Sequence, residues 1–336
     1  MTPPDTASDW AIVGGRLATG CVDLTSDPGA LDTSGFWVVV MTFEGALTCA
    51  RMGNVVPAGS DLASAPPWSM PARTDWDTSL GRDAYVAGVG AIRDRIAAGD
   101  VYQVNLCRLM SAPLASPPDL WSLGGALARG NPAPLAATVN LPAAGLHIAS
   151  ASPELFLRRD GDAVASAPIK GTGRTAADLT DKDAAENVMI VDLVRNDLAR
   201  VARPGSVEVP GLLRVEEHPG LVHLVSTVTA RLRPGCGWAE LLAAASPPGS
   251  VSGAPKSSAL RIIGELEPEP RGVYCGAVGW VDADRRRGAL AVGIRTFTWA
   301  DGRLLLGTGA GITWGSDPAQ EWDETELKVG RLLEVR

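Results

Sequence analysis

Hydrophobic residues recur along the chain with two different periods. In residues 82–99 they recur every three or four positions, which predicts a helix whose apolar face carries Tyr85, Val86, Val89, Ile92 and Ile96. Start and stop signals predict further helices at 120–128, 181–201, 237–245 and 256–267, and one that begins at Pro318. Shorter apolar runs predict strands, among them 36–41, 101–110, 163–169, 221–233, 273–282, 288–299 and 303–308.

The order of these elements indicates the fold class. Strands follow one another in hairpin-like succession and the helices stand apart, whereas a parallel doubly wound sheet requires regular alternation of strand and helix. A stretch at 56–73 that is rich in Pro, Ala and Ser is typical of an exposed connector, but no linker divides the chain. We therefore predict an α+β fold with one large domain.

The composition argues against several classes of function. The 336 residues are 46% hydrophobic and 20% charged, which suffices for a full core. The net charge of −8 argues against nucleic acid or an anionic membrane as a partner, so an anionic substrate would need local cations or a metal ion. There is no run of membrane-spanning length, no signal-peptide pattern at the N-terminus, and no regular spacing of the five cysteines. We expect a cytoplasmic protein with reduced thiols.

Lysine is scarce in this chain. Only four of the 30 basic residues are lysines, namely Lys170, Lys182, Lys256 and Lys328. Lysine, unlike arginine, can lose its proton and become a nucleophile. Lys170 follows an apolar run and precedes a glycine, which is typical of a strand that leads into a tight turn. The local pattern leaves two interpretations open: a reactive lysine, or a strand-end lysine that reaches water.

Acidic residues gather on two of the predicted helices. On the last helix, Glu321, Glu324 and Lys328 project from one face. On the helix at 181–201, Asp183 and Glu186 lie one turn apart. Carboxylates beside an apolar face can hold a hard cation such as Mg²⁺. The alternative is that these residues only favour the helix dipole and form ordinary ion pairs along the helix.

The remaining candidate site residues lie in two segments rich in small residues and in two predicted strands. The loop 247–256 and the segment 307–311, which we predict to be a turn, can offer backbone N–H groups to an anion, although turn chemistry alone also explains them. Arg295 shares a predicted strand face with small residues, which suits a carboxylate clamp; an edge-strand arginine facing solvent is the alternative. His223 lies in an apolar strand, a pattern typical of a core residue.

Taken in order, these segments resemble the chorismate-utilising enzymes: the large subunits of aminodeoxychorismate and anthranilate synthases, and the isochorismate and salicylate synthases. The matching blocks are Gly99–Leu106, Ser152–Glu154, Pro168–Thr172, Glu186–Asp197, the strand of His223, Ser250–Lys256, Ile294–Thr296, Gly309–Gly311 and Glu321–Lys328. Each block is short, but their joint occurrence in this order is highly specific.

The resemblance implies one chorismate-binding catalytic domain over residues 1–336, built from two packed antiparallel β-sheets flanked by helices. Within it, residues 1–75 form a shortened β-rich part and residues 82–335 the motif-bearing core. The implied catalytic residues are Lys170, Glu154 and His223, and the implied ligands of Mg²⁺ are Glu186, Glu321 and Glu324. The positions implied to bind chorismate are Tyr274, Arg295, Gly309, Ala310, Gly311, Lys328, Ser250, Gly253 and Ala254.

Two positions select among the subfamilies. Isochorismate and salicylate synthases are expected to carry a water-activating lysine where this chain has Gln103, and a glutamine cannot act as that base. Anthranilate synthases are expected to have alanine where this chain has Lys170, whereas lysine there is typical of aminodeoxychorismate synthases. The resemblance therefore implies amination of chorismate on the way to 4-aminobenzoate and folate. The alternatives are the large subunit of anthranilate synthase and a chorismate-binding regulatory protein without turnover.

The resemblance also implies a mechanism and a partner. An uncharged Lys170 would attack ring carbon C2 while the C4 hydroxyl departs, and ammonia would then enter at C4 as the lysine leaves. Glu154, if burial raises its pKa, would donate the proton that the hydroxyl needs. The chain shows no glutaminase motif, so the ammonia is expected from solution or from a separate glutamine amidotransferase subunit.

Overall fold

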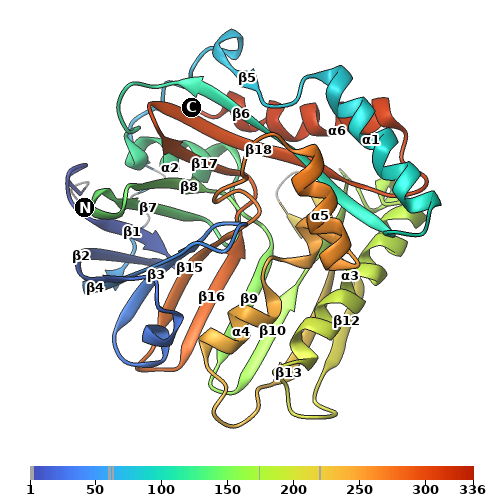
Figure 1. Cartoon of the computed structure of the whole chain (residues 1–336). Helices are drawn as coiled ribbons and strands as arrows, with labels where there is room; N and C mark the ends of the chain where they lie inside the picture. Colours follow the sequence, from blue (N-terminus) through green and yellow to red (C-terminus); the bar gives the residue numbers. More distant parts are fainter. Residues whose placement is uncertain (1–3, 60–61, 63, 174, 219–220) are drawn as a thin grey trace.

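The computed structural model describes residues 4–59, 62, 64–173, 175–218 and 221–336 (Figure 1). Its α-helices are α1 (Arg82–Ala97), α2 (Leu120–Gly130), α3 (Asp181–Ala199), α4 (Trp238–Ala245), α5 (Lys256–Leu266) and α6 (Pro318–Gly330). Each helix predicted from the sequence is present, with small differences at the ends. Apolar periodicity and caps therefore suffice to locate the helices.

The strands are numerous and mostly short. They are β1 (Trp10–Val13), β2 (Arg16–Thr25), β3 (Phe36–Met41), β4 (Leu47–Pro57), β5 (Asp77–Thr78), β6 (Gln103–Pro113), β7 (Ala137–Leu141), β8 (Leu146–Ser150), β9 (Leu155–Asp160), β10 (Ala163–Ala167), β11 (Ile169–Gly173), β12 (Glu208–His218), β13 (Leu221–Arg231), β14 (Gly253–Ala254), β15 (Ala277–Asp282), β16 (Arg287–Val292), β17 (Thr296–Ala300) and β18 (Arg303–Ile312).

The described strands pair only in antiparallel fashion, in one continuous network. Its order is β5, β6, β18, β17, β8, β7, β1, β2, β4, β3, β15, β16, β9, β10, β13 and β12, with β14 also beside β6 and β11 also beside β13. The α+β class is confirmed.

The network folds back on itself. Val38 and Val40 of β3 and Val278 of β15 share a buried cluster with Val139 of β7 and Ile148 of β8, although β3 and β15 are not hydrogen-bonded to β7 or β8. Side chains from two distant parts of the network thus form a common core. The two packed sheets that the sequence implied are the two halves of this network, continuous through the β1–β2 pair.

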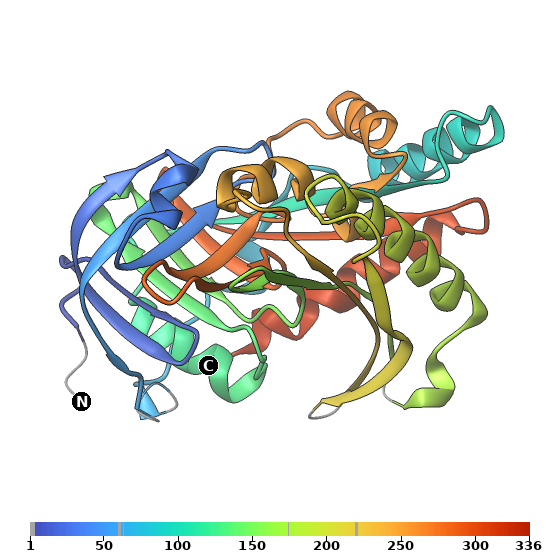
Figure 2. The ribbon, with the colours of Figure 1, turned by 90° about the horizontal axis from the view of Figure 1, so that it is seen from below.

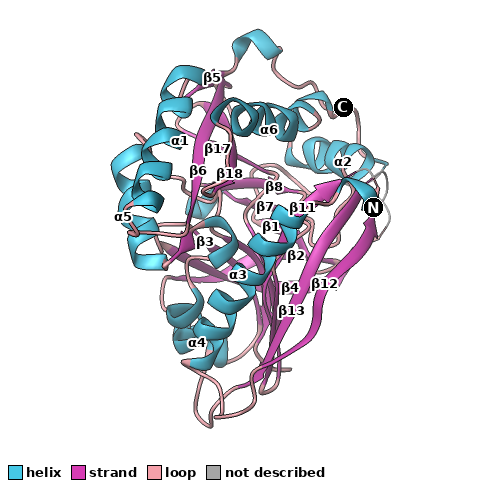
Figure 3. Ribbon diagram, turned by 90° about the vertical axis from the view of Figure 1, so that its right-hand side faces the viewer, coloured by secondary structure: helices cyan, strands magenta, loops and turns pink. Residues whose placement is uncertain are grey.

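Helices α3 and α6 pack against different parts of this network. α3 packs on β11, β12 and β13, and lies at the end of the molecule opposite the N-terminal strands (Figure 2). α6 packs on β18 and runs beside α1 (Figure 3). Two N-caps set the starts of these helices. The Thr180 side chain caps α3, and the Asp317 carboxylate accepts hydrogen bonds from Ala319 N and Gln320 N of α6, both at 3.0 Å.

Residues 288–299, predicted as one strand, are divided in the structure. β16 ends at Val292 and β17 begins at Thr296, and Arg295 between them has φ 51°, in the left-handed region. β16 pairs with β15 and β9, whereas β17 pairs with β18 and β8. The break therefore carries the chain from one half of the network to the other. The prediction that Arg295 lies on a strand face was wrong.

Two further expectations concern membranes and thiols. None of the helices in the described ranges combines the length and apolar character needed to cross a lipid bilayer. All five cysteines are free thiols, and Cys49, Cys107 and Cys275 among them are buried.

Candidate active site

A cavity of about 470 Å³ lies where α3, α6, β11, β13 and β18 come together. Its lining is mixed, with charged side chains from both helices and glycines from β18. Most of the site residues implied by the sequence line it, namely Lys170, Glu154, His223, Tyr274, Arg295, Gly309, Gly311, Lys328, Ser250, Glu186 and Glu324. Segments far apart in the sequence therefore meet at one place, while the chemical roles of these residues remain predictions.

Lys170 faces the cavity from β11. Its side chain is only 11% exposed, and its Nζ lies 4.0 Å from Glu186 Oε2. Gln103 Nε2 donates a hydrogen bond to the same carboxylate oxygen at 3.3 Å. Gly311 closes this group, since a Cβ there would lie 2.2 Å from Gln103 Nε2 and 3.2 Å from Lys170 Nζ. A larger residue at position 311 would therefore require the Gln103 amide to shift. Lys170 does not lie in bulk solvent.

Two more lysines approach the carboxylates of this region. Lys182 Nζ lies 2.9 Å from Glu321 Oε1 and 3.8 Å from Glu186 Oε1. Lys328 Nζ lies 2.6 Å from Glu324 Oε1. The carboxylates of Glu186, Glu321 and Glu324 are therefore each balanced by an ammonium group.

Asn187 fixes the position of Glu186. The Asn187 side chain is buried; its Nδ2 donates to Leu224 O at 3.0 Å, and its Oδ1 accepts a hydrogen bond from the Ser226 hydroxyl. Both partners lie on β13, which also carries the buried His223. Asp183 plays a different part, because its carboxylate accepts from Thr180 N at 2.8 Å in a capping box. Asp183 therefore completes the capping box of α3, while Glu186 reaches the lysines.

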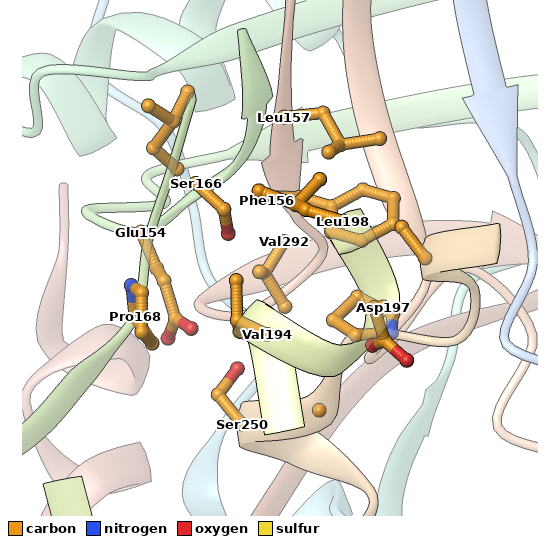
Figure 4. A pocket seen from close by; sticks show the side chains of 14 residues that line it. Glu154, Phe156, Leu157, Ser166, Pro168, Val194, Asp197, Leu198, Ser250 and Val292 are labelled. Carbon is orange, nitrogen blue, oxygen red and sulfur yellow. The ribbon is translucent and has the colours of Figure 1, made fainter. Parts of the chain in front are cut away.

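Glu154 is buried where the chain enters β9. Burial raises the pKa of Glu154 to about 7, although a hydrogen bond from Ser250 and the positive charges of Lys170 and Arg295 lower it. Figure 4 shows Glu154 and Ser250 beside a second, much smaller pocket of about 10 Å³. Glu154 can therefore hold a proton near neutral pH, as a general acid must.

The cavity has a lysine end, lined by Lys170, Lys182 and Lys328, and an arginine end, lined by Arg295 and Arg331. The two ends differ in how their charges are paired. Burial and the nearby positive charge of Arg331 lower the pKa of Arg295, while Glu154 raises it. Within the described part of the chain, neither guanidinium has a carboxylate at ion-pair distance. The Tyr274 ring lies beside them against Gly307, where a Cβ would come within 2.1 Å of the ring. This end of the cavity is suited to an anionic group.

Residues 307–311, predicted as a turn, lie in β18 opposite β6, so that prediction was wrong. Lys328 Nζ donates to Gly309 O at 2.9 Å, so the backbone of Gly309 points away from β6. In an antiparallel strand the N–H and C=O of one residue point to the same side and alternate along the strand. The N–H groups of Gly309 and Gly311 therefore face away from β6, whereas Ala310 directs its backbone groups to β6.

Four implied site residues do not line the cavity: Ala310, Gly253, Ala254 and Glu321. Ala310 packs in the apolar cluster on the other face of β18. Gly253 and Ala254 form β14, which pairs with Val104 and Gln103 at the start of β6. Glu321 lies behind the lining and reaches it through Lys182. The loop before β14 contributes Ser250 and Val251 instead.

The lining residues that were not among the predicted site residues include Lys182, Arg331 and Asn131. The scarcity of lysine, together with the i,i+4 spacing from Glu186, is a signal that would have identified Lys182. Arg331 and Asn131 lie just after helices α6 and α2, where nothing in the local sequence distinguishes them from ordinary helix ends.

The predicted ligands of Mg²⁺, Glu186, Glu321 and Glu324, all lie near the lysines of the cavity. In the part of the chain that the structure describes, no group of three or more His, Cys, Asp or Glu side chains lies close enough to hold a metal ion. Glu186 and Glu321 nevertheless converge on one cation, the Lys182 ammonium. Carboxylate oxygens are the ligands that Mg²⁺ prefers. The carboxylates of Glu186 and Glu321 are therefore suitable ligands for Mg²⁺, provided that the Lys182 ammonium moves from between them.

Comparison with known proteins identifies the family. Residues 42–334 match the chorismate binding enzymes. The chain belongs to this family. An anthranilate synthase component 1 of Streptomyces coelicolor is 42% identical over 289 residues, or 82% of this chain and 55% of the relative. An aminodeoxychorismate synthase component 1 of Klebsiella aerogenes is 42% identical over 271 residues, or 77% of this chain and 59% of the relative. The chain thus spans little more than half the length of these relatives.

Solved structures of chorismate-utilising enzymes share the fold. A structure described as a 2,3-dihydroxybenzoate-specific isochorismate synthase from Bacillus anthracis matches with a TM-score of 0.83 at 24% identity, covering 98% of this chain and 96% of the other. Anthranilate synthase component I from Streptococcus pneumoniae matches with a TM-score of 0.77 at 23% identity, covering 98% and 91%. These matches confirm the predicted fold.

Proposed function

We propose that this protein is the aminating component of an aminodeoxychorismate synthase, which converts chorismate and ammonia into 4-amino-4-deoxychorismate. The observation that carries the proposal is the position of Lys170, whose amine faces the cavity 4.0 Å from Glu186 and beside Gly311. Gln103 further supports it, because its amide contacts Glu186 and cannot serve as a base that activates water.

Chorismate carries two carboxylates, and the two ends of the cavity offer each of them a partner. Arg295, Tyr274 and the N–H groups of Gly309 and Gly311 would bind one carboxylate. The other would lie at the lysine end. Mg²⁺, held there by Glu186 and Glu324 with Glu321 nearby, would supply positive charge to the ring carboxylate. Binding at both ends would orient the ring relative to Lys170.

The reaction then needs a nucleophile and a proton donor. The uncharged amine of Lys170 attacks C2 of the ring, the double bond shifts, and the C4 hydroxyl leaves as water with the proton of Glu154. Glu154 recovers the proton that the new C–N bond releases. When ammonia attacks C4 and the Lys170 amine leaves, the same proton transfers restore both residues. His223, buried on β13, would orient the ring.

The proposal extends to the source of ammonia and to the cellular setting. Both relatives are named as a first component, which supports a second subunit, and a glutamine amidotransferase would supply ammonia as that subunit. The product would serve 4-aminobenzoate and folate synthesis in the cytoplasm, where the free cysteines would stay reduced.

Product analysis tests this proposal. The protein is incubated with chorismate, Mg²⁺ and ammonium chloride at alkaline pH, and the products are separated and identified. We expect 4-amino-4-deoxychorismate, which an added lyase converts to 4-aminobenzoate. The Lys170→Ala variant, as the matched control, should bind chorismate without forming product. Turnover by Lys170→Ala at the wild-type rate would overturn the assignment.

Anthranilate synthase component 1 is the second candidate, because a relative of that name is as similar as the aminodeoxychorismate synthases. The same assay separates the two functions: anthranilate and pyruvate would replace 4-amino-4-deoxychorismate as products. If chorismate protects the protein from thermal unfolding but no product forms with ammonia, a non-catalytic binding protein is indicated instead.

A further inference from the structure

We propose that Lys182 is an internal counter-cation: its ammonium occupies the position of the divalent metal in the metal-free protein and leaves when the metal binds. The inference rests on the proposed magnesium site but concerns metal affinity, not turnover. Its geometric basis is that one ammonium bridges Glu321 at 2.9 Å and Glu186 at 3.8 Å, two carboxylates that lie on different helices.

The charges of the cavity explain why such a cation is needed. Without a metal, Glu186 and Glu321 would face each other on α3 and α6 with like charges in a partly buried place. The Glu321 side chain is 4% exposed and the Glu186 side chain 12%. Two desolvated carboxylates repel each other strongly unless a cation lies between them. Lys182 supplies that cation from within the chain.

The exposure of the three side chains indicates that Lys182, and not Glu186 or Glu321, moves when a metal binds. The Lys182 side chain is 44% exposed, so its ammonium can turn to water at little cost, whereas the side chains of Glu186 and Glu321 are largely buried. Lys256 is a useful contrast. Its ammonium contacts Asp197 at 2.7 Å and Ala245 O at 3.0 Å, and its side chain is 17% exposed, which is typical of a permanent structural pair. Among the described residues, Lys182 has neither this burial nor a backbone acceptor.

The charge balance predicts coupling between metal and substrate. In the metal-free protein, with Lys170 charged, the three ammonium groups at this end match the carboxylates of Glu186, Glu321 and Glu324, which leaves little net attraction for a dianion. When Lys182 turns outward and a divalent ion takes its place, the region between Glu186 and Glu321 gains one unit of positive charge. Metal binding should therefore strengthen the binding of a dicarboxylate, and the reverse follows by linkage.

Calorimetric titration with Mg²⁺ alone tests the inference on the full-length protein without any turnover. We expect Lys182→Met to bind Mg²⁺ at least about tenfold more tightly than the wild type, because a competing unit charge is removed. In EDTA the same variant should unfold at a lower temperature, and Mg²⁺ should restore its stability. Arg195→Met is the matched control, since it removes an exposed ion pair with Asp192 on the same helix. It should change neither quantity.

Two further results keep the inference falsifiable. Lys182→Arg retains the positive charge and should keep the wild-type affinity for Mg²⁺ within a few-fold. If Lys182→Met binds Mg²⁺ with wild-type affinity or more weakly, or if it is as stable as the wild type in EDTA, Lys182 is not a counter-cation. If Lys182→Met binds Mg²⁺ more tightly but no chorismate is converted, the inference stands and only the proposed function fails.

Discussion

The two ends of the cavity carry charge in opposite ways. At the lysine end, Glu186, Glu321 and Glu324 each have an ammonium within 4.0 Å. At the arginine end, the guanidinium groups of Arg295 and Arg331 have no carboxylate at ion-pair distance within the described residues. One end is neutralised by the chain itself, and the other leaves positive charge for a ligand.

This difference indicates how a substrate with two carboxylates is oriented. A buried charge without a partner costs free energy that an arriving anion recovers, so the arginine end favours a carboxylate in any state of the protein. The lysine end becomes attractive only after its internal ion pairs rearrange. Under the proposed function, recognition and activation would take place at different ends of the cavity. Glu154 is coupled to both ends, since the charges of Lys170 and Arg295 both lower its pKa.

The largest expected effect is at the lysine end. Lys170→Arg keeps a positive charge near Glu186 but removes the nucleophile, so amination should fall by at least about 10³-fold. Chorismate affinity, measured by calorimetry, should change only a few-fold. If Lys170→Arg retains amination within tenfold of the wild type, the side chain acts through its charge, and the distinction between the two ends loses its chemical meaning.

The next largest effect concerns Glu154 and the pH dependence of the free energy of unfolding. Because burial raises its pKa from 4.5 to about 7, the folded protein binds a proton in this window that the unfolded chain has lost, so stability falls as pH rises through it. Glu154→Gln removes this loss and should gain up to about 3 kcal/mol relative to the wild type above the window. Urea unfolding of both proteins across the window measures it, and parallel curves would contradict the buried-acid assignment.

Gly311→Ala tests the close approach at the lysine end. The new Cβ would lie 2.2 Å from Gln103 Nε2 and 3.3 Å from Glu186 Oε2, so the side chains around Lys170 must shift. We expect kcat to fall by about 10²-fold, as for a misplaced catalytic group. Gly315→Ala is the control, because an added Cβ there meets nothing within 4 Å. Equal activity of the two variants would show that the convergence is not required.

The smallest expected effects are changes in KM when Arg295 or Arg331 is replaced, and they should differ between the two arginines. Arg295→Gln removes a desolvated charge and should raise KM by about 10- to 100-fold. Arg331 is exposed at the cavity mouth, so Arg331→Gln should raise KM only a few-fold, and by less at high salt. Steady-state kinetics at two ionic strengths measure both. Equal losses that do not depend on salt would mean that both arginines bind the substrate directly.

Much of the fold was accessible from the sequence because it depends on local patterns. The six helices followed from apolar periodicity and caps, and the α+β class followed from their order. The failures share one cause. Arg295 lies at a break between strands, and Gly307 and Gly311 belong to a strand instead of a turn. In each case long-range strand pairing, which the local sequence does not encode, decides the backbone.

The site followed a similar division. The order of the motifs predicted Lys170 and Glu186 as site residues, and in the structure both line the same cavity. The spacing of Lys182 from Glu186 was visible in the sequence, but its shorter contact, with Glu321 on α6, was not. Ion pairs between distant helices become visible only when the fold is known.

Mass spectrometry gives the sharpest test of the proposed bond between the Lys170 amine and the substrate ring. The protein is incubated with chorismate and Mg²⁺ without ammonia, then digested and mapped. We expect the peptide with Lys170 to gain the mass of chorismate less one water, and ammonium to remove this adduct. Lys170→Arg should never form it. Rapid ammonia-dependent turnover by a protein whose Lys170 stays unmodified under every trapping condition would contradict the account.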